Sequence, residues 1–82
     1  MNMQNLDKRV AQLLSEARVS KQLSIRQVAA KVGVAPSTIM RIEAADQKPS
    51  LFLVMQMCQA LDISAARLVA KLEEDTPDHT QE

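Results

Sequence analysis

The chain has 82 residues, of which 46% are hydrophobic, and its ten basic and ten acidic side chains give a formal net charge of zero. This length allows one small domain around a single modest core. The sequence has no apolar run of about 18 residues, no signal peptide and only one cysteine, which argues against a membrane span, secretion and an internal disulfide, so we expect a cytoplasmic protein without cofactors or metal.

The residue types predict an all-α fold. There are one glycine, three prolines and one aromatic residue, and no alternating run of β-branched residues bounded by turns. The first helix is expected at about residues 5–19, where apolar residues recur at helical spacing: Leu6, Val10, Leu13, Leu14 and Ala17.

A second, shorter helix is expected from Ile25 to about Val32. Ser24 can accept from the amide three residues on, and Gln27 at that position can reach back to complete a capping box. Gly33 follows the last apolar residue, where a left-handed residue ends a helix at low cost. The sequence therefore predicts a helix followed at once by a tight turn.

A third helix is expected to begin at Pro36, whose φ already suits a first helical position. Ile39 and Ile42 would point toward the core at helical spacing. The outward side would then present Ser37, Thr38, Met40, Arg41 and Ala44. This helix-turn-helix arrangement makes the outward side a candidate reader of a DNA groove.

Two more helices are expected before a polar end. Ser50 caps one of them after Pro49, and its inward row is Leu51, Val54, Cys58 and Leu61. Ser64 caps the last helix, whose apolar residues are Leu68, Val69 and Leu72. Cys58 is expected to be a small core residue rather than a reactive thiol. The domain would span residues 1–72, and the acidic residues 73–82 would be disordered.

One pattern runs through roughly residues 6–70: Arg18, Val28-Ala29, Gly33-Val34, Ser37-Thr38-Ile39, Arg41-Ile42-Glu43 and Pro49-Ser50, followed by Leu61 and Ile63. In order and spacing it resembles the Cro and phage-repressor (XRE-like) helix-turn-helix family. The resemblance implies a compact five-helix, lambda-repressor-like DNA-binding domain. Two positions depart from the family pattern, because Ile25 replaces a glutamine that often touches phosphate and Pro36 replaces a polar residue.

The resemblance also suggests roles for individual residues. Arg18 and Glu43 would form an ion pair that fixes the third helix to the first, two separate solvated charges being the alternative. Base contacts would come from Ser37, Thr38, Met40 and Arg41, of which only Arg41 can make a bidentate contact to guanine. The candidate site is completed by phosphate contacts and by the residues that open the two helices: Arg26, Lys31, Lys48, Ile25 with its backbone amide, and Pro36.

The charges are unevenly distributed along the chain. Residues 1–48 hold eight basic and four acidic side chains, a net charge of +4, whereas the remainder holds two basic and six acidic ones, a net charge of −4. Because the Debye length is about 8 Å at physiological salt, a phosphate backbone senses the nearby basic face more than a distant acidic segment. Zero net charge is therefore compatible with DNA binding, although it lowers nonspecific affinity.

Residues 51–58 are apolar on nearly every side of the expected helix. A single buried face within a monomer cannot cover all of these side chains. A homodimer would bury the surplus, and a symmetric pair would suit a symmetric DNA site. The candidate dimer surface consists of Phe52, Met55, Val69 and Leu72. A core position is the alternative for each of them, and for Met55 and Leu72 the two positions are equally favoured.

Three functions fit these features. The leading one is a sequence-specific transcriptional regulator, a repressor that binds a palindromic operator in double-stranded DNA as a homodimer. The alternatives are an antitoxin-type regulator that also binds a toxin protein, and a helix-turn-helix used only as a protein-interaction module. An enzyme is not expected, because the sequence offers no catalytic constellation and no glycine-rich phosphate loop.

Overall fold

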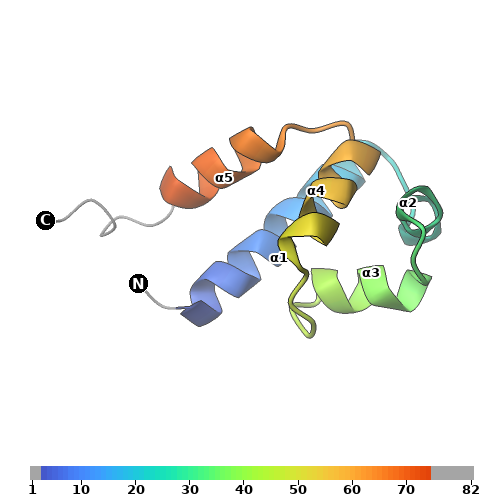
Figure 1. Cartoon of the computed structure of the whole chain (residues 1–82), viewed down its shortest axis with the longest axis horizontal. Helices are drawn as coiled ribbons and strands as arrows, with labels where there is room; N and C mark the ends of the chain where they lie inside the picture. The colour runs from blue at the N-terminus through green and yellow to red at the C-terminus, as the bar shows by residue number, and fades with distance from the viewer. Residues whose placement is uncertain (1–2, 75–82) are drawn as a thin grey trace, which may run out of the picture.

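The computed structural model describes residues 3–74, which form five α-helices and no strand. The helices are α1 (Met3–Ser20), α2 (Ile25–Val32), α3 (Pro36–Glu43), α4 (Leu51–Ala60) and α5 (Ala65–Glu74). Along the longest axis, α2 and α3 lie toward one end, and the start of α1 and the end of α5 lie toward the other (Figure 1). The predicted all-α, five-helix fold is confirmed.

The predicted caps set the ends of α2 and the start of α4. The amide of Gln27 donates to Ser24 Oγ at 3.0 Å, and Gln27 Oε1 accepts from the amide of Ser24 at 2.7 Å. Gly33 ends α2 with a φ of 90°, a left-handed conformation that glycine adopts without strain. Ser50 Oγ accepts from the amide of Leu53 at 3.0 Å. These local bonds fix the short turn between α2 and α3 and the starting point of α4.

The other left-handed residues of the described chain are not glycines. Gln22, Ala45 and Asp62 have φ values of 60°, 61° and 56°. After each of them, the next amide donates to a carbonyl five residues earlier and closes the preceding helix, as Asp46 does to Arg41 at 2.9 Å. A left-handed backbone is strained for alanine, because its methyl group crowds the backbone and cannot form the local hydrogen bonds that a polar side chain can. The α3–α4 connection is thus held in a tight turn that returns over the end of α3.

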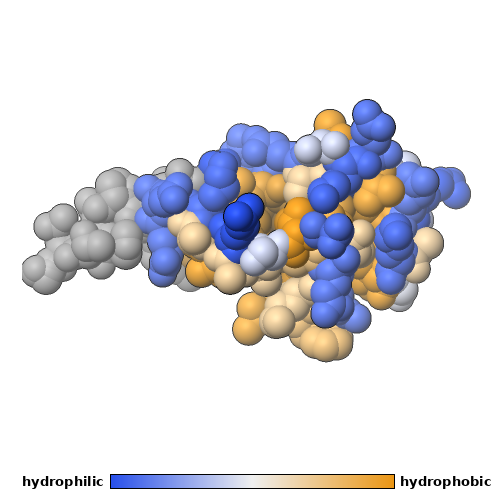
Figure 2. All heavy atoms as spheres, turned by 90° about the horizontal axis from the view of Figure 1, so that it is seen from above, coloured by the Kyte–Doolittle hydropathy of each residue, from blue (hydrophilic) through white to orange (hydrophobic). Residues whose placement is uncertain are grey.

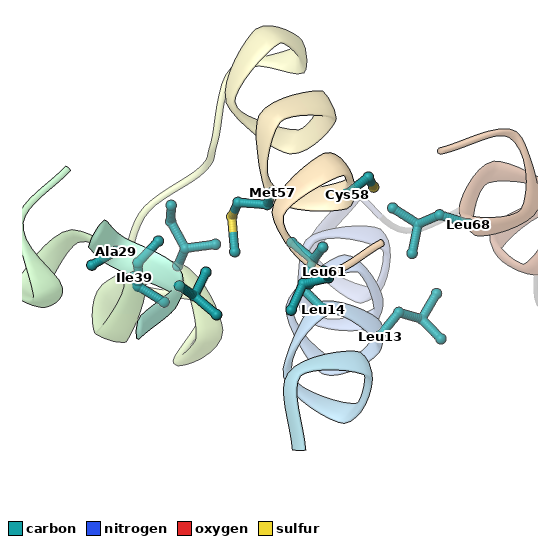
Figure 3. Packing of buried hydrophobic residues seen from close by; sticks show 10 residues of the cluster. Leu13, Leu14, Ala29, Ile39, Met57, Cys58, Leu61 and Leu68 are labelled. Atoms are coloured by element: carbon teal, nitrogen blue, oxygen red, sulfur yellow. The ribbon is translucent and has the colours of Figure 1, made fainter. Parts of the chain in front are cut away.

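The core is aliphatic and lies among the five helices. Ile39 of α3 and Met57 of α4 are fully buried, and Met57 points toward Ile39 and Ala29 (Figure 3). Cys58 lies on the other side of α4, facing Leu68 of α5. Its side chain is 2% exposed, so the predicted core position of Cys58 is confirmed. α4 therefore packs in two directions, toward the helix-turn-helix and toward α5.

The inward row expected for α4 is wrong at its first residue. Leu51 is 73% exposed, whereas Met57, which was left out of the row, is 0% exposed. Each residue turns a helix by about 100°, so a buried face centred near Met57 and Leu61 carries Leu51 to its edge. Leu51 also sits in the first turn, where fewer neighbours surround it. Leu51 therefore joins the exposed apolar side chains of α4, and Met57 takes a place in the core.

The C-terminal helix is longer than expected. α5 continues to Glu74, so residues 73 and 74, which were assigned to a disordered segment, are helical. The rest of that predicted segment lies outside the described residues. Within residues 3–74 no single helix is long and apolar enough to cross a membrane. Only α4 and α5 taken together have that length and apolar character, and the two helices are bent by 113° relative to each other.

Candidate nucleic-acid interface

The outward side of α3 presents the residues that the sequence assigned to base contact. Ser37, Met40 and Arg41 are exposed, Met40 by 56%, and Thr38 is half-buried. Ile39 on the opposite side is fully buried and seats the helix on the core. The exposed strip therefore combines hydroxyls, one flexible apolar side chain and one guanidinium. These groups match the edges of bases in a major groove, where hydroxyl, methyl and guanine contacts are made.

The start of α3 has no side-chain cap. Ala35 occupies the N-cap position, and the exposed Pro36 follows as the first helical residue. The amide of Thr38 donates to the Ala35 carbonyl at 2.9 Å. Pro36 lacks an amide hydrogen, so it can contact a ligand only through its ring and carbonyl.

An ion pair joins α1 to the end of α3. Arg18 Nε donates to Glu43 Oε2 at 2.8 Å and Arg18 Nη2 donates to Glu43 Oε1 at 3.0 Å. Arg18 Nη1 also donates to the Leu23 carbonyl at 2.9 Å. The side chains are only 17% and 8% exposed, and the hydrogen bond to Glu43 raises the pKa of Arg18, with desolvation opposing it and the charge of Glu43 adding to it. One guanidinium thus links α1, the α1–α2 turn and α3.

Arg41 has a partner that sequence reasoning missed. Its Nε donates to Gln47 Oε1 at 3.0 Å on the surface, across the turn that follows α3. Gln47 is half-buried, whereas Arg41 is exposed. The acceptor is a neutral amide, so this contact brings no negative charge to offset the positive charge of Arg41. A separation of six residues across a turn has no periodic signature, so the sequence offered no signal for this contact.

The residues of α2 in the candidate site are placed differently from one another. The amides of Ile25 and Arg26 have no acceptor within the described chain, because Ser24 caps the amide of Gln27 instead. Ile25 packs its side chain against the core and Arg26 is exposed. Lys31 is also exposed, but it lines a hollow together with Gln56 and Gln59 of α4. Lys31 therefore borders an open hollow between α2 and α4.

Lys48 is exposed and has a partner on α1. Its Nζ lies 3.5 Å from Asp7 Oδ2, and the two side chains are 76% and 32% exposed. Sequence reasoning missed Asp7 because the pair depends on how α1 packs against the segment before α4. A pair this exposed contributes little to stability and can open when a phosphate approaches.

The apolar surface expected for a dimer lies on α4 and α5. Phe52 is 70% exposed, Met55 47% and Val69 48%, whereas Leu72 is half-buried and packs against the core. Val69, Leu72 and Leu51 help to line an open, largely apolar hollow of about 340 Å³ among α1, α4 and α5. Hydrophobic residues also gather at the edge of the face shown in Figure 2, beside hydrophilic ones.

Two observations concern side chains that could hold a metal ion or act as a nucleophile. Within residues 3–74 there is no group of three or more His, Cys, Asp or Glu side chains that could hold a metal ion. Burial raises the pKa of the Cys58 thiol, which keeps it protonated.

Two of three comparisons with known proteins place the chain among them. A helix-turn-helix family model matches residues 14–68. Among solved structures, the chain is similar to a point mutant of the restriction-modification controller protein C.Esp1396I, with 18% identity and a TM-score of 0.79 over 90% of this chain and 94% of that one. It is also similar to the restriction-modification controller protein C.AhdI from Aeromonas hydrophila, with 30% identity and a TM-score of 0.72 over 78% of this chain and 96% of that one. No curated protein matches.

Proposed function

This chain belongs to the helix-turn-helix family of DNA-binding transcriptional regulators, and we propose that it is a sequence-specific repressor that binds a palindromic operator as a homodimer. α3 would lie in the major groove, with Arg41 on a guanine and Ser37, Thr38 and Met40 on neighbouring base edges. Arg26, Lys31, Lys48 and the free amides at the start of α2 would hold phosphates. Repression would follow from occupation of a promoter.

The observation that carries this proposal is the division of α3 into two sides. Its inward isoleucines are 0% and 1% exposed, while its outward side leaves the guanidinium of Arg41 in solvent with its charge intact. The bidentate Arg18–Glu43 pair holds the end of this helix against α1. A helix that is held in place and carries a polar strip on its outward side favours the interpretation that it reads a DNA groove over the interpretation that its polar residues only face solvent.

A homodimer is supported by the exposed apolar side chains on α4 and α5. Phe52, Met55 and Val69 lie outside the monomer core, together with Leu51. One helix-turn-helix reads only a few base pairs, so two copies related by a two-fold axis would extend the site to two symmetric half-sites. The toxin partner and the protein-interaction module remain predictions from the sequence, which no specific contact in the structure favours.

Selection of bound sequences from random duplexes, at a stated salt concentration, tests this function. We expect an enriched motif made of two inverted half-sites. The two named neighbours are restriction-modification controllers, so DNA around the gene for this chain, and around any restriction-modification genes beside it, is the first natural sequence to test. Absence of any enriched motif at low salt would contradict the proposal and favour a protein-interaction module.

Two variants separate base reading from phosphate binding. Arg41→Ala should relax the preference at one position of each half-site, because a good bidentate contact is worth about 1–3 kcal/mol of discrimination. Lys48→Ala should weaken binding to all duplexes alike and reduce the salt slope by about one unit. If the two variants changed binding in the same way, Arg41 would not be reading a base.

A further inference from the structure

Gln47 is not among the predicted site residues, but its side chain contacts Arg41, which is. We propose that Gln47 is a positioning residue for Arg41, which fixes the guanidinium so that its terminal nitrogens meet one base edge. The proposal deepens the DNA-reading function proposed above and rests on it. It makes Gln47 a determinant of sequence preference without any contact between Gln47 and the base.

The geometry of the contact leaves the reading atoms of Arg41 available. A guanidinium has five N–H donors in a fixed fork, and only the Nε–H is used by Gln47, at 3.0 Å. The two terminal nitrogens are the atoms that can donate together to guanine O6 and N7. A neutral amide acceptor holds the side chain at its inner nitrogen and does not cancel its charge. Gln47 therefore restricts the orientation of Arg41 and leaves its hydrogen-bonding edge for the ligand.

The turn after α3 brings Gln47 back beside Arg41. Ala45 is left-handed, with a φ of 61°, and the amide of Asp46 donates to the Arg41 carbonyl at 2.9 Å. The backbone next to Gln47 is thus bonded to the residue that its side chain also holds. Pro49 confines the residue before it to extended conformations, and α4 begins two residues later, at Leu51. Gln47 therefore lies in a segment fixed at both ends.

The two partners differ in burial, so Gln47 can act as a fixed acceptor for the more mobile side chain of Arg41. Gln47 is half-buried and lines the apolar hollow of α1, α4 and α5 together with Ile42, whereas Arg41 is exposed. An exposed arginine samples many rotamers, and ordering one such side chain on binding costs about 0.5–1.5 kcal/mol. Ordering it beforehand corresponds to about a twofold to tenfold gain in preference for the correct base.

The test compares base preference in matched variants of the full chain. Arg41→Ala first identifies the position that Arg41 reads, and binding is then measured to duplexes that carry each base there. We expect Gln47→Ala to lower the preference at this position by about twofold to tenfold, with an unchanged salt slope. Gln47→Glu should keep the preference, because a carboxylate accepts the same Nε–H, while binding to all duplexes weakens. Gln12→Ala is the control, since Gln12 also holds a side chain on the surface, Glu16 of α1, at 3.0 Å.

The same measurements give the results that would overturn the proposal. An unchanged preference in Gln47→Ala would do so, and a lowered melting temperature with that unchanged preference would assign the contact to fold stability alone. Lost preference at a different position would mean that Gln47 reads a base itself. A further loss when Gln47→Ala is added to Arg41→Ala would show that the two residues act independently. If the unaltered chain selects no sequence, the proposed function fails and this proposal fails with it.

Discussion

Glu43→Ala should destabilise the fold strongly, because it leaves the guanidinium of Arg18 largely unpaired. The substitution removes two charge-assisted hydrogen bonds, of 2.8 and 3.0 Å, and leaves only the bond from Arg18 to the Leu23 carbonyl. Removal of one partner from a fully buried ion pair costs about 3–5 kcal/mol. Arg18 is 17% exposed, so water can reach it in part, and we expect a cost of about 2–3 kcal/mol.

Thermal unfolding followed by circular dichroism measures this cost. For a domain of this size, a loss of about 2–3 kcal/mol lowers Tm by roughly 10–20 °C. Glu16→Ala is the matched control, because Glu16 also accepts a side-chain hydrogen bond, from Gln12, but on an exposed face of α1. Its effect should be about 0.5 kcal/mol or less. If Glu43→Ala lowered Tm no more than Glu16→Ala does, the pair would not be holding α3 to α1.

The pH dependence of the pair gives a second check on the same argument. The folded-state pKa of Arg18 is raised, so the contribution of its charge is present at every pH below the ordinary arginine pKa and is lost only above it. The Tm difference between Glu43→Ala and the unaltered chain should therefore stay constant from neutral to moderately alkaline pH. High salt should change it little, since screening acts mainly on exposed pairs. A difference that vanished in salt would indicate a solvated pair.

Four further outcomes are expected. Asp7→Asn should raise affinity for all duplexes about twofold in a binding titration, because Lys48 loses a competing carboxylate; unchanged affinity would contradict a phosphate role for this pair. Phe52→Glu should shift a dimer toward monomer in sedimentation, whereas Val19→Glu, at a side chain 61% exposed on α1, should not; a monomeric unaltered chain would refute the dimer. Cys58 should react with a thiol reagent only on unfolding, and because its folded pKa is raised, stability should be constant below the ordinary thiol pKa and fall above it, a fall that Cys58→Ala removes. Ala45→Gly should raise stability by about 0.5–1 kcal/mol by relieving a left-handed alanine, and a lowered Tm would refute that strain.

The features predicted correctly from the sequence depend on a few neighbouring residues. The capping box of Ser24 and Gln27, the turn at Gly33 and the helix start at Pro36 each depend on contacts within about one helical turn. Ile39 lies on the buried side of α3 because spacing along a helix fixes which residues share a face. Local chemistry therefore determined both the helix-turn-helix and the residues on its outward side.

The features that the sequence did not reveal depend on how whole helices are rotated and placed. α4 is apolar nearly all round, so its spacing alone could not decide whether Leu51 or Met57 faces the core. In the structure α4 packs against α2, and Met57 points toward Ala29 of α2 and Ile39 of α3 (Figure 3). Lys31 stays a predicted phosphate contact, and its position beside a hollow between α2 and α4 is likewise a result of helix placement that its spacing did not indicate. The spacing of residue types therefore predicts which side of a helix is exposed only when the apolar residues of that helix lie on one side.

Partner identity distinguishes two cations that the sequence treated alike. Arg41 is held by a neutral amide, so its charge is undiminished and its orientation is restricted, which suits a contact that must choose among bases. Lys48 faces a carboxylate at 3.5 Å, which a phosphate must displace, and an ammonium on a flexible stem imposes little geometry. Because a phosphate is the same at every base pair, loose geometry costs Lys48 nothing there. The contacts around each cation thus support base reading by Arg41 and sequence-independent attraction by Lys48.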